Sequence, residues 1–426
     1  MKERVVVSGM GAISSIGKNI NEFTDSLKVG RSGIGRIRNS FDPPISVSIA
    51  AEIHDISFDS YLEGCAEYSG IPPGFTNEVR QCARRAPFAV QGSISAATEA
   101  WSRAELFKNS LAPDRVGIII AGNNLTEHYQ YGLYEKFKQT PEYLSPTYAL
   151  HYLDTDQVGT ISEIFKIRGE GFTVGGASAS GNIGILKGFQ LIQLGLVDAC
   201  MVIGSMAHLS PMELQGFYNI GAMGGKRFSN EPEKACRPFD MDHEGFIYGQ
   251  ASGCLILESL KSATARGIAK LAEISGGALV LDGNRLSDPN EAGEIRAMEI
   301  ALSQAQINAI DVSYINTHGT SSPKGDETEL KAIRKVFKRK TSDIWINATK
   351  GFTGHCLYSA GVIEAIATII QMNEGFVHPN INLDNPIEYD FKFCGKELSQ
   401  ADIQIALSNS FGFGGINTSL VLQRIE

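Results

Sequence analysis

Two histidines and one serine stand out because each lies in a turn built from small residues. His318 is followed by Gly-Thr-Ser-Ser-Pro, His355 is preceded by Thr-Gly, and Ser178 lies within Gly175–Gly181, which reads GGASASG. Two neutral imidazoles at the ends of strands can donate hydrogen bonds to an oxygen on which negative charge develops. A single histidine is more often a packed or surface residue than a catalytic one, so the matching turns are what make these two residues candidates.

The stretch Gly171–Gly195 is expected to position Ser178. Phe172–Val174 is typical of a strand end, and the apolar residues over 183–194 predict a helix that is buried on nearly all sides. Gly195 suits the C-terminal cap of that helix. Since the start of a helix offers free N–H groups and positive potential, the turn would present Ser178 to a pocket with these properties.

Strands and helices alternate along the chain, which indicates an α/β architecture. A boundary near residue 258 would divide it into an N-terminal half (1–258) and a C-terminal half (259–426). Strands are expected at Val5–Ser8, Val116–Ala121, Ala199–Ile203, Gly253–Leu257, Tyr314–Asn316, Ile344–Asn347 and Ile405–Leu407. Helices are expected at Arg80–Glu99, Asp326–Phe337 and Gly361–Met372.

Two further segments attract attention. Gly9–Ala12 is expected to form a tight turn after the first strand, and with the next glycine at Gly17 the dinucleotide-binding spacing fails. Residues 126–155 are rich in tyrosine and lack a regular apolar period, which suits a segment covering a pocket or a subunit interface.

The composition narrows the class of protein. A net charge of −9 over 426 residues argues against broad nucleic-acid binding. The seven scattered cysteines include no CxxC pair, which disfavours a disulfide framework or a zinc site and suits a reducing cytoplasm. The apolar stretch at the start of the chain is too short for a signal peptide and is interrupted by glycine. No apolar run reaches the length of a membrane helix. We therefore expect a cytoplasmic protein without a metal site.

Several longer motifs give the chain a family resemblance. Asn316–Asp326 reads NTHGTSSPKGD, Asn347–His355 reads NATKGFTGH and Asn409–Asn417 reads NSFGFGGIN. Arg237–Asp240 (RPFD) and Asp242–Phe246 (DHEGF) add a further signature within the N-terminal half. Because these motifs occur in one order over the full length, the chain resembles the β-ketoacyl-acyl carrier protein synthases of the thiolase-like fold. The resemblance implies an α/β fold of five α-β-α-β-α layers with two duplicated halves, usually assembled as a homodimer.

The departure from that family concerns Ser178. Synthases place a nucleophilic cysteine at this turn, where a lowered pKa makes a thiolate available to take an acyl chain. A hydroxyl is far less acidic, so acyl transfer onto Ser178 would be slow and condensation largely lost. Decarboxylation of a malonyl thioester needs no nucleophile; it needs donors to the enolate oxygen, which His318 and His355 would supply. Ser178 would line the pocket and donate its backbone N–H to the thioester oxygen.

The retained histidines point to one subgroup. The chain resembles serine-bearing homologues that decarboxylate malonyl-acyl carrier protein to the acetyl form for β-branching in bacterial polyketide and antibiotic biosynthesis. That resemblance implies an acyl carrier protein whose phosphopantetheine arm brings the substrate, no permanently bound cofactor, and a downstream HMG-CoA-synthase-like enzyme. The alternatives are a condensing synthase that works through serine and a chain-length-factor-like partner subunit of an active ketosynthase.

The resemblance also suggests roles for surrounding residues. Lys350 would pair with Glu364 and fix the His355 loop, and Asp326 and Glu329 would hold the active-site loops. The gate loop would comprise Phe411, Gly412, Phe413 and Gly414, with Phe413 between the acyl pocket and the phosphopantetheine channel. Arg80, Arg84 and Arg85 are either a solvated helix face or a docking patch for the acidic carrier protein.

Overall fold

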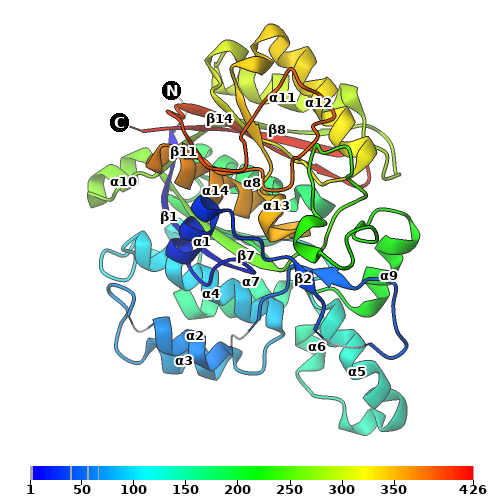
Figure 1. The fold of residues 1–426 in the computed structure, drawn as a ribbon. Coiled ribbons are helices and arrows are strands. Elements are labelled where there is room, and N and C mark those ends of the chain that lie inside the picture. Colours follow the sequence, from blue (N-terminus) through cyan, green and yellow to red (C-terminus); the bar gives the residue numbers. More distant parts are fainter. Residues whose placement is uncertain (1–2, 39–40, 55–56, 66, 426) are drawn as a thin grey trace.

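Eleven strands form one continuous mixed sheet in the computed structural model, which describes residues 3–38, 41–54, 57–65 and 67–425 (Figure 1). In spatial order they are β12 (Lys392–Phe393), β10 (Trp345–Asn347), β9 (Tyr314–Asn316), β14 (Ile405–Gly412), β15 (Ile416–Gln423), β8 (Ala272–Leu281), β1 (Val5–Ser14), β7 (Ala251–Ser259), β6 (Ala199–Gly204), β4 (Val116–Ala121) and β5 (Gly171–Val174).

The sheet consists of two halves with the same strand order. Each half has five main strands, which we number one to five in the order of the chain. Side by side in the sheet, they lie in the order three, two, four, five, one. This order is β5-β4-β6-β7-β1 in one half and β10-β9-β14-β15-β8 in the other. The pairing directions also repeat. In both halves the fifth strand pairs antiparallel with the first and the fourth, and the second strand pairs parallel with the fourth and the third. The halves join where β1 pairs with β8. This repetition confirms the predicted duplication, whereas the boundary near residue 258 stays a prediction.

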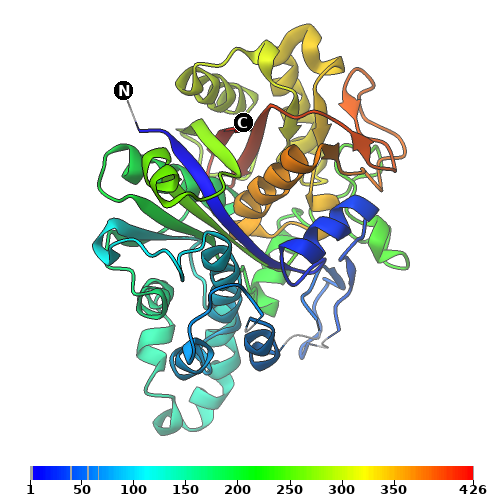
Figure 2. The ribbon, with the colours of Figure 1, turned by 90° about the vertical axis from the view of Figure 1, so that its left-hand side faces the viewer.

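Two helices fill the space between the halves and give the fold its middle layer (Figures 1 and 2). Helix α8 (Ser180–Gln193) contacts β6, β4 and β15, and α14 (Ala360–Glu374) contacts β7 and β14. The outer faces carry α4 (Phe88–Arg103) and α7 (Thr155–Phe165) on one half and α11 (Glu291–Ala305) and α12 (Pro323–Phe337) on the other. The predicted α-β-α-β-α layering is therefore confirmed.

The remaining elements surround these layers. The helices are α1 (Ile20–Val29), α2 (Phe58–Cys65), α3 (Phe75–Ala83), α5 (Glu127–Gln139), α6 (Tyr148–His151), α9 (Pro211–Asn219), α10 (Leu260–Arg266) and α13 (Lys350–Thr353). The 3-10 turns are η1 (Pro113–Arg115), η2 (Pro141–Tyr143), η3 (Ala177–Ala179), η4 (Pro232–Lys234), η5 (Ala309–Asp311), η6 (Lys338–Ser342) and η7 (Leu357–Ser359). Two small sheets pair β2 (Gly35–Arg36) with β3 (Ile49–Ala50) and β11 (Phe376–Val377) with β13 (Ser399–Gln400).

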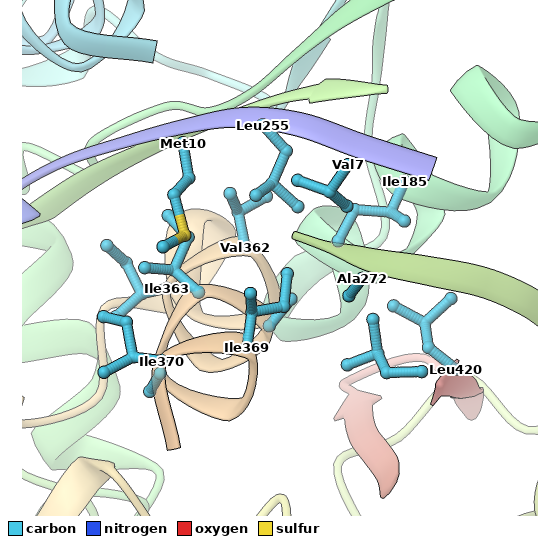
Figure 3. Close-up of a cluster of buried hydrophobic side chains, with 14 of the residues drawn as sticks. Val7, Met10, Ile185, Leu255, Ala272, Val362, Ile363, Ile369, Ile370 and Leu420 are labelled. Carbon is cyan, nitrogen blue, oxygen red and sulfur yellow. The ribbon is translucent and has the colours of Figure 1, made fainter. Parts of the chain in front are cut away.

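The largest hydrophobic cluster is built around the middle layer. Figure 3 shows Val362 and Ile363 of α14 close to Met10 of β1 and Leu255 of β7. All four side chains are buried. Because α8 and α14 are apolar on nearly all sides, both sheet halves can pack against them, as predicted for the segment before Gly195.

The middle helices cross at two glycines near their N-termini. A Cβ added at Gly181 would lie 2.7 Å from the backbone nitrogen of Val362, and one at Gly361 would lie 2.6 Å from Oδ1 of Asn182. Such separations leave no room for a side chain. The crossing therefore brings the turns η3 and η7, which precede the two helices, into contact.

Two sequence predictions were wrong. Gly9–Ala12 is not a turn, because β1 continues to Ser14; a Cβ at Gly9 would lie 2.3 Å from the carbonyl oxygen of Ala100, so Gly9 lets the strand approach α4. The helix expected over 80–99 is two helices, α3 and α4, separated at Pro87, which has no N–H to continue a helical ladder. Among the described residues, no helix has both the length and the apolar character needed to cross a bilayer.

The helix crossing predicts the effect of a small substitution. Gly181→Ala should lower the free energy of unfolding by roughly 1–3 kcal/mol, since the methyl group meets backbone that cannot move aside. Urea denaturation would measure the change. Gly159→Ala in α7, where a Cβ meets nothing within 4 Å, is the matched control and should not destabilise the protein. Equal loss of stability in both variants would contradict the crossing.

Candidate active site

The structure brings the three predicted side chains together. Ser178 lies in the middle of η3, His355 lies just before η7, and His318 follows β9. The Oγ atom of Ser178 is 2.8 Å from Nε2 of His355. The ring centroids of the two histidines are 5.5 Å apart, with the rings nearly perpendicular. A turn from the N-terminal half thus meets two turns from the C-terminal half at one site.

His355 is held as a neutral hydrogen-bond donor. The backbone N–H of Leu357 donates to Nδ1 of His355 over 3.3 Å, which assigns the ring proton to Nε2. Burial lowers the pKa of His355 well below its usual range, and the positive charge of Lys350 acts in the same direction. The Nε2–H group therefore donates toward Ser178 and cannot accept the proton of its hydroxyl.

His318 has the same character. Its Nδ1 atom lies 3.5 Å from the ammonium group of Lys350, so Nδ1 is the acceptor and Nε2 carries the proton. Burial lowers the pKa of His318 strongly, followed by the charge of Lys350 and the neighbouring His355. The site therefore offers two neutral Nε2–H donors.

Lys350 connects both histidine loops. Its backbone lies in α13, directly before His355, and its ammonium group donates to the backbone carbonyl oxygen of His318. The same group forms an ion pair with Glu364 of α14, and both side chains are almost fully buried. Burial raises the pKa of Glu364 to about 6, opposed by Lys350 and the Ser410 hydroxyl. From the sequence, Lys350 was expected to fix the His355 loop. In the structure, the Lys350 side chain also contacts the His318 loop.

Two buried carboxylates hold the loop that carries His318. Glu329 accepts the backbone N–H groups of His318 and Gly319, each over 2.8 Å, and the side-chain amide of Asn409 over 3.2 Å. Burial raises the pKa of Glu329 to about 7 against these hydrogen bonds.

Asp326, one helical turn earlier, ties the same loop to the RPFD segment. It accepts from the backbone N–H of Phe239 over 2.8 Å and contacts Nδ1 of His243 over 3.0 Å. It also accepts the N–H of Ser321 over 3.2 Å. The contacts of Asn409 and His243 were missed in the sequence, although both residues lie inside motifs that had been noted.

The end of β14, which forms part of the predicted gate loop, lies against the Ser178 turn. A Cβ at Gly412 would lie 2.5 Å from the carbonyl oxygen of Gly176, and the Phe411 ring is 5.5 Å from that of His318. Phe413 is 37% exposed, and Gly414 has a φ of 87°, which favours glycine. Phe413 is therefore partly open to solvent, its ring lies 6.3 Å from that of Phe217, and its role as a gate stays a prediction.

Cys356 is a site neighbour that sequence reasoning missed. Cys356 directly follows His355 in the sequence, and this adjacency could have been noticed. Its Sγ atom lies 3.6 and 3.8 Å from the carbonyl oxygens of Thr353 and Gly354. Burial raises the pKa of Cys356 to about 12, so it supplies no thiolate at neutral pH.

The three arginines of the predicted docking patch lie around the break between α3 and α4. Arg80 forms an ion pair with Asp59 over 2.8 Å, while Arg84 and Arg85 are exposed. They lie outside the turns that carry Ser178, His318 and His355, and their role stays a prediction. In the part of the chain that the structure describes, no group of three or more histidine, cysteine or carboxylate side chains is arranged to hold a metal ion.

The fold and the site define an enzyme of the ketosynthase class. Models for the beta-ketoacyl synthase N-terminal and C-terminal domains match residues 2–263 and 271–384, and the chain belongs to this family. It is 38% identical over 99% of its length to "Polyketide biosynthesis malonyl-ACP decarboxylase PksF" of Bacillus subtilis, covering 97% of that protein. It is 32% identical over its full length to "3-oxoacyl-[acyl-carrier-protein] synthase 2" of Staphylococcus aureus, covering 99% of it. Among solved structures, "The ishigamide ketosynthase/chain length factor" superposes with a TM-score of 0.87 at 27% identity, covering both chains fully.

The assigned tautomers predict how the two rings titrate. Because burial lowers both pKa values well below 6.5, His318 and His355 should stay neutral from pH 8 down to pH 6, protonated only at Nε2. Heteronuclear NMR of imidazole-labelled protein would show this, with signals assigned through His318→Gln and His355→Gln. An inflection near pH 6.5 in either ring, or a proton on Nδ1, would be evidence against the assignment.

The buried ion pair predicts a pattern of stability changes. Lys350→Met should lower the free energy of unfolding by about 3–5 kcal/mol, since it leaves Glu364 buried without its partner. The double variant Lys350→Met/Glu364→Leu should regain most of this loss, because it removes both charges. Urea denaturation would compare the variants. A double variant no more stable than Lys350→Met would show that the uncompensated carboxylate is not the cause.

Proposed function

We propose that the protein decarboxylates a malonyl group carried as a thioester on an acyl carrier protein, giving the acetyl thioester and carbon dioxide. The observation that carries this proposal is the pair of neutral Nε2–H donors beside a serine in place of a thiol. The carrier protein and its phosphopantetheine arm are inferred from the family to which the chain belongs.

The site suits the charge changes of this reaction. As the bond between the carboxylate carbon and C2 breaks, its electron pair moves onto C2 and the thioester oxygen, and carbon dioxide leaves. The Nε2–H groups of His318 and His355 would donate to that oxygen, where the negative charge of the enolate develops. A proton from water then adds to C2 and completes the acetyl group. In this scheme the backbone N–H of Ser178 supports the same oxygen.

A condensing reaction through Ser178 is the main alternative. The 2.8 Å contact with His355 at first suggests a nucleophile and its base. However, the Leu357 N–H occupies Nδ1, so the nitrogen that faces Ser178 already bears a proton. A serine without a base forms an acyl ester slowly. The chain-length-factor alternative is disfavoured because both imidazoles and the loops that hold them are intact.

The biological setting is inferred from the relative in Bacillus subtilis, whose name combines polyketide biosynthesis with malonyl-ACP decarboxylation. Acetyl-carrier produced here would serve an HMG-CoA-synthase-like enzyme that consumes acetyl donors. The exposed Arg84 and Arg85 would attract an acidic carrier protein.

The same proposal includes a homodimer. Strand β5 lies at one edge of the sheet, ends four residues before Ser178 and pairs with β4 on its inner side. A second copy could add its own β5 to this edge. The neighbouring tyrosine-rich segment would widen such an interface, since it exposes Tyr134, Phe137 and Tyr143.

The decisive experiment follows the mass of a malonyl-loaded carrier protein incubated with the purified enzyme. The expected product is acetyl-carrier without a stable acyl adduct on Ser178. His318→Ala and His355→Ala should each reduce the rate by roughly 10²–10³-fold, as for the loss of an oxyanion donor. Ser178→Ala should reduce it by no more than about ten-fold, the value of one neutral hydrogen bond.

Several outcomes would count against this function. A carrier that stays malonylated would refute the decarboxylation, and an acyl adduct on Ser178 would favour the condensing synthase. An inactive Ser178→Ala variant beside active histidine variants would refute the assigned roles. His54→Ala, at a partly exposed histidine outside the site, is the matched control and should leave the rate unchanged.

A further inference from the structure

Tyr358 holds the position in the C-terminal half that Ser178 holds in the N-terminal half. Each is the middle residue of a 3-10 turn that leads directly into a central helix, η3 before α8 and η7 before α14. Both turns begin with a residue in the left-handed region, Ala177 with a φ of 47° and Leu357 with a φ of 50°. Because η3 and η7 contact each other, the turn that carries Tyr358 lies next to the turn that carries Ser178.

The ring of Tyr358 closes against the end of β4. A Cβ at Gly122 would lie 3.3 Å from Cβ and 3.4 Å from Cδ2 of Tyr358, so the ring packs directly on this glycine. The next residue, Asn123, lies against the Ser178 turn, since a Cβ at Gly175 would be 3.1 Å from its Cβ. The Tyr358 ring and the segment 122–123 thus form a continuous wall beside that turn.

The Tyr358 side chain is well packed but not fully covered. It packs against two hydrophobic clusters, and the residue stays partly exposed. Burial raises its pKa, and so do the charges of Glu127 at the start of α5, Asp154 before α7 and Glu213 of α9. The phenol therefore stays neutral, and the carboxylates that act on it belong to three separate parts of the chain.

We propose that Tyr358 is a specificity-determining residue that limits the reacting acyl group to the unsubstituted malonyl unit. The inference rests on the decarboxylation proposed above. With the thioester oxygen at the two imidazoles, the acyl carbons extend past Ser178 toward the ring of Tyr358. A longer chain, or an alkyl group on C2, meets this ring.

The first test compares substrates of different size. Decarboxylation of malonyl-carrier and ethylmalonyl-carrier would be measured as kcat/KM in the wild type, Tyr358→Ala and Tyr358→Phe. Tyr358→Ala should raise the ethylmalonyl-to-malonyl ratio by at least about ten-fold, since one methylene in a fixed pocket changes selectivity by about 10–200-fold. Tyr358→Phe keeps the ring and should keep the wild-type ratio. Tyr389→Ala, at a tyrosine 77% exposed, is the matched control and should also keep it.

The second test needs no turnover. Calorimetry would compare the binding of acetyl- and hexanoyl-pantetheine analogues that carry an amide in place of the thioester. The wild type should bind the hexanoyl analogue more weakly than the acetyl analogue, and Tyr358→Ala should remove or reverse this preference. Thermal unfolding would check that the variant is folded, and Tyr358→Leu replaces it if alanine is not tolerated.

The outcomes separate the two proposals. The role of Tyr358 is overturned if the wild type accepts ethylmalonyl as readily as malonyl. It is also overturned if folded Tyr358→Ala neither raises the ethylmalonyl-to-malonyl ratio nor loses the preference for the acetyl analogue. The proposed decarboxylation stands in both cases. A wild type inactive on malonyl-carrier refutes the function instead, and the binding comparison then still decides whether Tyr358 limits the acyl group.

Discussion

The close crossing of the two central helices is the constraint on which the site depends. At Gly181 and Gly361 the absence of side chains lets α8 and α14 approach until the backbone of one meets the other. Their N-terminal turns then touch, which sets Ser178 at hydrogen-bond distance from His355 although 177 positions separate them. Any larger residue at the crossing would push apart the two halves of the site rather than only loosen the core. The duplicated fold thus positions its chemistry through the contact between its two copies.

A single buried charge then defines the chemical character of that site. The ammonium group of Lys350 lies against Nδ1 of His318, pairs with Glu364 and disfavours protonation of both imidazoles. Burying such a pair contributes little stability, because desolvation offsets most of the attraction. It contributes to orientation instead: both rings stay neutral, and Nδ1 of His318 faces the ammonium group, which leaves the proton on Nε2. Donors fixed in this way suit an enolate, whereas nucleophilic catalysis through serine would need a free basic nitrogen.

Much of this arrangement could be predicted from the sequence. Strong apolar runs predicted the buried strands and central helices, and the motifs around His318, His355 and Phe413 predicted which turns converge. Local patterns were misleading where a distant partner decides the structure. Gly9 suggested a turn, yet it serves the approach of α4. The break at Pro87 in the helix expected from Arg80 to Glu99 is different, because a proline is a local signal that the sequence already contains. The tautomer of His355 depends on one backbone N–H at Leu357, and the contact of Lys350 with His318 spans two loops. No periodicity in the chain records such contacts.

The duplication explains why one turn geometry has two uses. Both copies keep a left-handed residue before a displayed side chain, at Ala177 and at Leu357, and a backbone in this region is costly for residues other than glycine. In the first copy the displayed residue, Ser178, faces the imidazoles. In the second copy it is Tyr358, which faces the end of β4 and the carboxylates beyond it. The two turns touch, so a large residue in the second turn lies near the first. In the functions proposed above, the first turn governs which reaction the site performs, and the second turn governs how large an acyl group can reach it.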